Sequence, residues 1–141
     1  MIDPDQAIEI SDNAWEKVGF DAKKLPYAVR TVHLIARLNV ETILGGILGW
    51  LSNAGGYARE TVEALECVGA HTGASIVREV IAFFPDGTPS FSAQERAQQI
   101  MDIADVAESH WSELGDRLLT WPDDINALLQ KFINEHEADF I

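Results

Sequence analysis

The fold is decided by the stretch Glu41-Thr-Ile-Leu-Gly-Gly-Ile-Leu-Gly-Trp-Leu-Ser-Asn53, the most apolar segment of the chain. Its large apolar residues are Ile43, Leu44, Ile47, Leu48 and Leu51. They recur at helical spacing and predict a helix that is buried over most of its circumference. A glycine inside a helix costs roughly 1 kcal/mol relative to alanine, so the glycines of this stretch need a structural reason. We interpret Gly45 and Gly49, which share one side, as the place where a neighbouring backbone packs closely.

Two helix start signals precede this stretch. Asp3-Pro4 predicts a helix over residues 4–18, with Asp3 as the N-cap and Pro4 in the first turn. Pro26 predicts the start of a second helix that runs to about Asn39. The central helix is then expected as a separate element.

The chain after the central helix also has a helical pattern. Ser92-Ala-Gln-Glu95 has the sequence of a capping box and predicts a helix that runs to about Leu119, unless Gly115 breaks it. There is no convincing alternating strand pattern and no internal repeat. We therefore predict an all-α fold: a compact single-domain bundle of six to seven helices over residues 1–141.

Charge is the strongest compositional signal. The chain has 10 Lys and Arg against 23 Asp and Glu, a formal net charge of -13. This balance argues against direct binding of nucleic acid or of an anionic membrane surface, and it suits a basic protein partner. Acidity for solubility alone is the alternative. One cysteine, no signal-peptide pattern and an apolar run about half the length of a membrane span predict a cytoplasmic protein.

No set of residues in the chain has the pattern of a catalytic or metal site. The histidines are His33, His71, His110 and His136, and none completes a Glu-x-x-His or His-Glu-x-x-His motif. The glycines at 45, 46 and 49 have neither the spacing nor the lysine of a phosphate-binding loop. We therefore expect no catalytic residues, no metal and no cofactor, and a protein that is not an enzyme.

The acidic residues gather in the last third of the chain, where residues 88–141 carry 3 basic and 11 acidic residues. Along the helix opened by Ser92, a step of 100° per residue places five acids within an arc of about 80°. They are Glu95, Asp102, Asp105, Glu113 and Asp116. Only Arg96 and Arg117 interrupt them. This predicted acidic surface could bind a basic partner; an ordinary solvated helix face is the alternative.

The density of these charges limits a comparison with DNA. On a straight helix the five acids would span about 32 Å, or about one charge per 8 Å, against one per 3.4 Å on a DNA strand. Imitation of DNA would therefore need acids from other helices. The candidates are Glu60, Glu63, Glu66, Asp123 and Asp124.

Three motifs in order resemble a known family. Glu41, Gly45-Gly46, Trp50-Leu51, Asn53 and Gly56 are similar to the motif Glu-x-x-Asn-Gly-Gly-Phe-x-Gln-aromatic-apolar-x-Asn-x-x-Gly. The segments 62–70 and 81–89 are similar to the family's next helix and to its Phe-Pro-x-Gly-x-Pro turn. The chain thus resembles the bacterial DNA-mimic protein family over about residues 25–135. The resemblance implies an all-helical fold and an acidic surface that occupies the site of a DNA-binding protein, often in a dimer.

The chain departs from the family pattern within the first motif. Leu44 stands where the family usually has Asn, Ile47 where it has Phe, and Gly49 where it has Gln. The polar residues of that motif are therefore replaced here. For this reason we expect function at the acidic surface rather than at the glycines.

Three functional hypotheses remain open. The first is a non-catalytic acidic protein that binds a basic protein, such as a DNA-binding regulator, as a DNA mimic and with a homodimer as one possible state. The second is an immunity or antitoxin protein that neutralises a basic toxin. The third is a small-ligand-binding or enzymatic domain with a pocket near Glu41, His33 and Trp50. A lone carboxylate in an apolar stretch is costly, so Glu41 is expected to pair with Arg37, one turn away.

Overall fold

The computed structural model describes residues 1–141 and contains helices and turns but no β-strand. The α-helices are α1 Pro4–Lys17, α2 Tyr27–Ala54, α3 Ala58–Val68, α4 His71–Ile81, α5 Ala93–Leu119 and α6 Ile125–Glu135. Short 3-10 turns occupy Ala22–Lys24, Gly55–Tyr57, Pro85–Gly87 and Glu137–Phe140. The turn at Gly55–Tyr57 joins α2 to α3 without a break, so the chain forms five separate helical segments. The predicted all-α class is confirmed, and the predicted count of six to seven helices is slightly too high.

The predicted helix starts are set by local hydrogen bonds. The Gln6 amide donates to Asp3 Oδ1 at 2.8 Å, and the Asp3 amide donates to Gln6 Oε1 at 2.9 Å, which completes a capping box at the start of α1. At the start of α5 the Glu95 amide donates to Ser92 Oγ at 3.3 Å. No return bond from the Glu95 side chain accompanies it, so this cap is half of the predicted box. Both helices begin where the sequence predicts.

The break in α2 lies inside the stretch that was expected to be one helix. α2 continues through Asn39 to Glu41 without interruption, so the expected boundary there is wrong. The helix instead kinks at Gly46, whose backbone has φ 68 and ψ -172. That conformation is essentially confined to glycine, because a side chain would clash with the backbone. The kink is why this position needs a glycine.

The kink also changes which apolar residues of the stretch are buried. Ile47, Trp50 and Leu51 lie in the core, with at most 2% of each exposed. Ile43 and Leu44, before the kink, are 61% and 80% exposed. The expectation of a helix buried over most of its circumference is therefore wrong. The expectation of close packing at Gly45 is wrong too, since a Cβ there would meet nothing within 4 Å.

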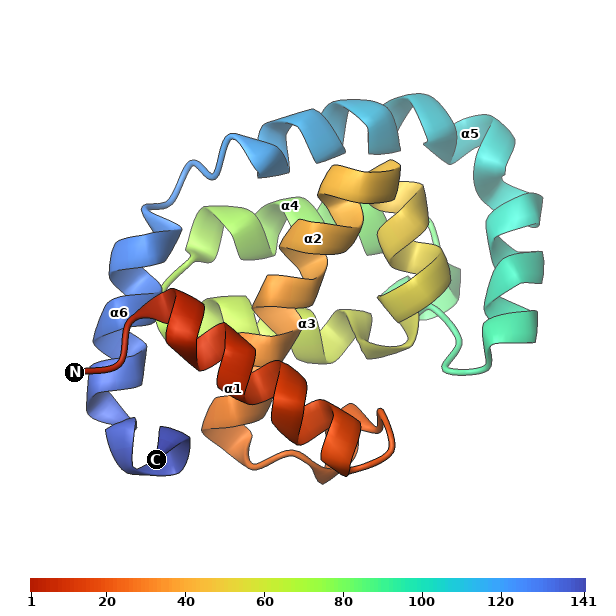
Figure 1. The fold of residues 1–141 in the computed structure, drawn as a ribbon. Helices are drawn as coiled ribbons and strands as arrows, with labels where there is room; N and C mark the ends of the chain where they lie inside the picture. The colour runs from red at the N-terminus through yellow and green to blue at the C-terminus, as the bar shows by residue number, and fades with distance from the viewer.

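α2 lies at the centre of the molecule and contacts α1, α3 and α5 (Figure 1). The long helix α5 curves around one side and also packs against α4, while α6 lies beside α1 and α3 at the other end. Gly115 does not break α5; it gives room to Ile47, since a Cβ there would come within 3.2 Å of Ile47 Cγ1. One continuous core of 34 buried apolar residues connects the helices.

The continuous segment Tyr27–Val68 is long and apolar enough by composition to cross a membrane. The central helix of a water-soluble protein passes the same test. Here the segment is kinked at Gly46 and packs against the four other helices, α1, α4, α5 and α6.

Candidate functional site

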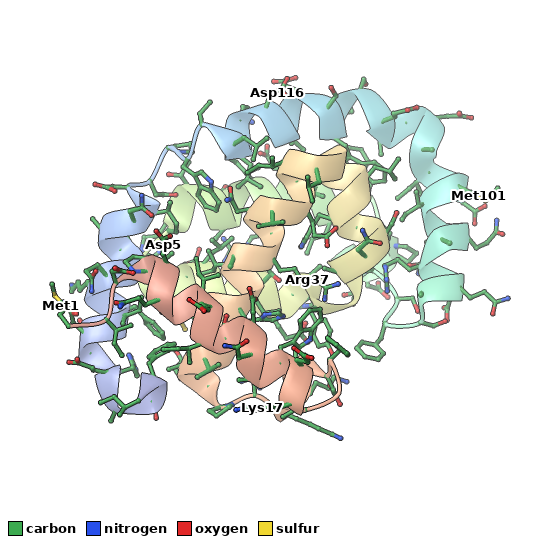
Figure 2. The ribbon with its side chains drawn as sticks, viewed as in Figure 1. Met1, Asp5, Lys17, Arg37, Met101 and Asp116 are labelled. Carbon is green, nitrogen blue, oxygen red and sulfur yellow. The ribbon has the colours of Figure 1, made fainter.

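The outer face of α5 is acidic. All five acids of the predicted surface are exposed, and Glu108, which lies outside the predicted arc, is exposed as well. We call the six together the α5 acidic face: Glu95, Asp102, Asp105, Glu108, Glu113 and Asp116. Two large apolar side chains lie between the acids, Met101 at 72% and Val106 at 68% exposure. Figure 2 shows Met101 and Asp116 pointing outward from different parts of this helix.

Only one of the two arginines of α5, Arg117, stays exposed beside this face. Arg96 is only 4% exposed and turns inward, where Nε donates to the Leu51 carbonyl at 2.7 Å. Arg117 lies 3.5 Å from the Glu79 carboxylate of α4, in an ion pair. A signal for Arg96 was present in the sequence, because the same 100° step places it among the apolar residues of α5. The exposed face therefore has one positive charge fewer than expected, and the one that remains is paired with Glu79.

The curvature of α5 changes the shape of the predicted stripe. Figure 1 shows that the first and last parts of the helix run in different directions around the molecule. The expectation of one straight stripe is therefore wrong, and the acids follow a convex arch. A partner would have to be concave, or would have to contact only part of the α5 acidic face.

Most of the additional acids are engaged elsewhere. Asp123 accepts from the Gly73 amide at 2.8 Å at the start of α4, and Asp124 accepts from the Ala127 amide at 3.3 Å at the start of α6. Glu66 contacts His71 at 2.9 Å and Arg78 at 3.2 Å. The hydrogen bond from His71, followed by the charge of Arg78, lowers the pKa of Glu66. Of the additional candidates, Glu60 and Glu63 are exposed and form no ion pair.

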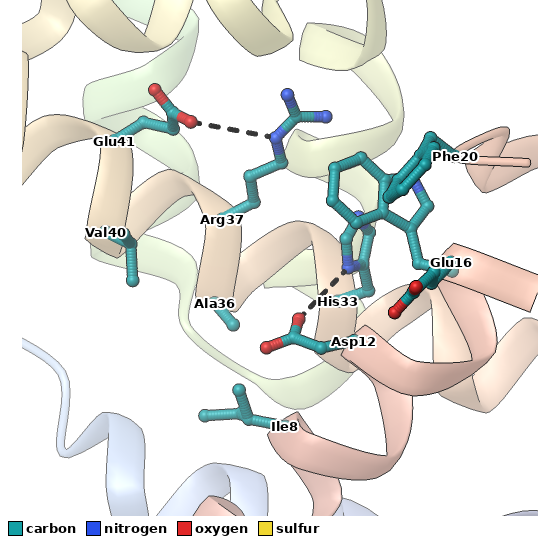
Figure 3. Close-up of a pocket in the computed structure, with 10 residues that line it drawn as sticks. Ile8, Asp12, Glu16, Phe20, His33, Ala36, Arg37, Val40 and Glu41 are labelled. Carbon is teal, nitrogen blue, oxygen red and sulfur yellow. Dashed lines mark ion pairs between the residues drawn. The ribbon is translucent and has the colours of Figure 1, made fainter.

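The hypothesised pocket residues are brought together only in part. His33 and Glu41 line a cavity of about 400 Å³ between α1 and α2 (Figure 3). Trp50 does not line it; this side chain is fully buried in the core. The physical reason is the kink at Gly46, which redirects the second half of α2. The residues of α1 in the cavity wall were not predicted, because they are distant in the sequence.

Glu41 is paired, as its position in an apolar stretch required. Its carboxylate accepts a hydrogen bond from Asn53 Nδ2 at 2.7 Å and lies 4.0 Å from Arg37 Nε. Arg37 in turn donates to the Asn53 carbonyl at 3.0 Å, and its guanidinium lies 4.8 Å from the centre of the Trp15 ring. These contacts join the two halves of α2 across the kink. Glu41 and Asn53, both part of the family motif, therefore have a structural role.

His33 is a buried histidine without a hydrogen-bond partner. It is 2% exposed, and neither ring nitrogen makes a hydrogen bond. Its Nδ1 lies 3.9 Å from Asp12 Oδ1, which is too long for a hydrogen bond. Burial, followed by the nearby charge of Arg37, lowers the pKa of His33 from 6.5 to about 4. The ring is therefore neutral at physiological pH.

Replacement of His33 by phenylalanine should flatten the acid side of the stability curve. Below pH 6.5 the unfolded chain binds a proton at His33 before the folded protein does, because the folded pKa is about 4. Between pH 6.5 and pH 4 the free energy of unfolding of the wild type should thus fall by about 3 kcal/mol more than that of His33→Phe, because one pKa unit corresponds to about 1.4 kcal/mol. Urea unfolding of both proteins across this range measures the difference. Parallel curves would show that His33 is not held neutral.

The chain contains no group of three or more His, Cys, Asp or Glu side chains placed to hold a metal ion. A search of the curated proteins and a search of the solved structures find no match. A family model described as DMP19-like protein matches residues 23–136, which is most of the chain and close to the range over which the sequence resembles DNA-mimic proteins. The chain, with its helical fold and the acidic face of α5, therefore belongs to the DMP19-like protein family.

Proposed function

We propose that this protein is a non-catalytic, cytoplasmic, acidic protein that binds the basic surface of a DNA-binding protein and competes with DNA for it. The observation that carries the proposal is the α5 acidic face, with six exposed carboxylates. Of the two arginines on this helix, Arg96 is buried and Arg117 is paired with Glu79. Membership of the DMP19-like family, named after DNA mimic protein 19, supports the same function.

The charge density of the face is compatible with partial imitation of DNA. Six acids along about 32 Å of helix give about one charge per 6 Å, against one per 3.4 Å on a DNA strand. Exposed Met101 and Val106 add apolar contact area between the charges. A protein partner can use such apolar contacts, whereas they contribute nothing to phosphate recognition. The face therefore suits a basic protein groove that also has apolar side chains.

Neutralisation of four acids should weaken this binding strongly. The variant changes Asp102, Asp105, Glu113 and Asp116 to the corresponding amides. Loss of four exposed interfacial charges should weaken the complex by about 30-fold or more, because each contributes about 0.5–1 kcal/mol. Affinity capture of basic DNA-binding proteins from a native lysate, followed by titration of the captured partner, measures the change. The melting temperature should stay unchanged, since these side chains are exposed.

The matched control removes four charges from the other end of the molecule. Asp5, Glu9, Glu135 and Asp139 form no ion pair, and they lie on α1, α6 and the C-terminal turn. Their amides should leave binding within about twofold if the surface of α5 is the site. Equal loss in both variants would show a general charge effect instead. Binding that survives neutralisation of α5, or that is unaffected by about 0.5 M salt, would contradict the electrostatic proposal.

An experiment on competition with DNA distinguishes a DNA mimic from an immunity or antitoxin protein. A DNA mimic should release labelled DNA from the captured partner in proportion to its own occupancy, because both ligands use one site. Capture of a basic toxin that binds no DNA would instead support the immunity or antitoxin function. An adjacent toxin gene would point the same way.

A further inference from the structure

The cavity between α1 and α2 is separate from the α5 acidic face. Its wall includes Ile8 and Asp12 of α1, Phe20 after α1, and His33 and Val40 of α2 (Figure 3). α5 contributes no residue to it. At about 400 Å³ the cavity lies within the range that holds small organic molecules.

The charged groups around the cavity favour a cation. Three carboxylates and one guanidinium line it, those of Asp12, Glu16 and Glu41 and that of Arg37. Glu41 and Arg37 are already engaged with Asn53. Asp12 has no hydrogen-bond partner at its side chain, and burial raises the pKa of its carboxyl group. Glu16 makes neither an ion pair nor a side-chain hydrogen bond. The free charge in the cavity is therefore negative.

Polar atoms without partners mark where the charged end of a ligand would lie. Nδ1 of His33 faces the carboxylate of Asp12 across 3.9 Å (Figure 3). Nδ1 of His33 is closed to solvent, so a donor reaches it only after the exposed Asp12 side chain shifts, and it would then hydrogen-bond to both groups. In the tautomer with its proton on Nε2, the neutral imidazole offers a lone pair at Nδ1, and the carboxylate only accepts, so such a donor needs two N–H or O–H groups. An ammonium group meets this requirement and also offsets the charge.

The remaining walls are apolar and partly open. Val40 is 49% exposed and Phe20 60% exposed, and Ile8 and Ala36 complete this side. Phe20 adopts φ 61, an unusual conformation for a bulky residue, and its ring meets that of Trp15 edge-on at 4.9 Å. A short hydrocarbon chain would be shielded from water by these side chains.

We propose that this cavity binds a small alkylammonium ion, with the ammonium group between His33 Nδ1 and Asp12 and the hydrocarbon chain against Ile8, Val40 and Phe20. The ion is either a free amine or the side chain of a lysine. The site does not depend on the surface of α5, so the two proposals can fail separately. A divalent metal is a poorer occupant, because no three ligating side chains converge here.

The test is an NMR titration of the full chain with n-butylammonium chloride at about pH 7.5, where a histidine of depressed pKa is neutral. The His33 ring and Trp15 indole signals should shift and saturate. n-Butanol and sodium butyrate, at equal ionic strength, should bind about tenfold more weakly or worse, because they lack the charge-assisted hydrogen bonds. Equal binding of butanol, preferred binding of butyrate, or the absence of a saturable shift would overturn the proposal. Absence of a saturable shift would mean that the cavity holds only water.

Variants of α1 locate the ammonium group. Asp12→Asn should weaken n-butylammonium binding by about tenfold, since one charged partner is lost. Glu9→Gln, one turn away on the same helix and outside the cavity wall, should change it by less than about twofold. Asp12 is 62% exposed, so its replacement should leave the fold intact. Unchanged affinity in Asp12→Asn would place any bound amine elsewhere and refute the site.

A parallel titration with N-acetyl-lysine methylamide distinguishes the two sources of the ion. Binding at least as tight as that of n-butylammonium would assign the cavity to a lysine side chain of a protein. Weaker binding would assign it to a free amine. Both results support the alkylammonium site, provided that Asp12→Asn weakens the binding of both ligands.

Discussion

Arg96→Ala should lower the free energy of unfolding by about 3–5 kcal/mol, the largest effect that we expect from a single substitution in this protein. Arg96 is 4% exposed and has no carboxylate partner. Its guanidinium instead donates to Leu51 and Ser52 at the end of α2, at 2.7 and 2.9 Å. It also donates to the carbonyls of Ser90 and Phe91 before α5, at 2.9 and 3.1 Å. One side chain thus joins two helix ends that are distant in the sequence.

The large effect follows from the burial of the acceptors. The Leu51 carbonyl already accepts from the Gly55 amide, so Arg96 supplies its second hydrogen bond, and a cation at the end of α2 is also favoured by the helix dipole. Removal of the guanidinium leaves several carbonyls without that donor and creates a cavity beside Gly55. A Cβ on Gly55 would lie 2.9 Å from Arg96 Cδ, which shows how closely the arginine fits against the turn.

Arg117→Ala is the matched control for Arg96→Ala. It removes an arginine from the same helix, but its side chain is 49% exposed and its ion pair with Glu79 is 3.5 Å long. We expect a change of about 1 kcal/mol or less, as for other surface ion pairs. Urea unfolding measures both variants. Equal effects of the two substitutions would show that the buried arginine does not stabilise the junction between α2 and α5.

Gly46→Ala should destabilise the protein by about 2–3 kcal/mol, because only glycine readily adopts the backbone conformation at this position. φ is 68 and ψ is -172 there, and a Cβ would meet no other atom within 4 Å. The cost is therefore one of backbone strain and not of steric contact with neighbouring elements. Thermal or urea unfolding measures it.

Gly45→Ala isolates that strain. Gly45 is the preceding residue and has helical geometry, and a Cβ added to it would likewise meet nothing within 4 Å. Alanine there should stabilise α2 by about 0.5–1 kcal/mol, through its higher helix propensity. The two neighbouring substitutions should therefore differ in sign. A Gly46→Ala variant as stable as Gly45→Ala would mean that α2 can straighten without loss of packing.

The predictions made from the sequence succeeded where the cause is local. Asp3 caps α1 through an amide three residues away, and Ser92 does the same for α5. The exposure of the five predicted acids follows from the helical period of α5, which also explains why its apolar residues face the core. These features depend on neighbours within one or two helical turns, so the sequence pattern contains the information.

The predictions failed where the cause is a contact between distant segments. Three glycines lie in the central stretch, and the local sequence does not distinguish Gly46, the one at the kink, from Gly45 and Gly49. Trp50 was expected near a pocket and lies in the core instead, because the kink turns it inward. The cavity between α1 and α2 places Asp12 of α1 beside His33 of α2, and nothing in either segment alone predicts that pairing.

The sequence by itself determined the all-α class, the starts of α1 and α5, the acidic character of the chain and the family to which it belongs. Each of these is a property of composition, of helical period or of a local motif. Only the tertiary structure decided that Glu41 to Asn53 bends at Gly46, that Arg96 leaves the acidic face, and that α1 closes a cavity over His33. The physical reason is that burial and hydrogen bonding between distant segments, rather than local propensity, fix these three features.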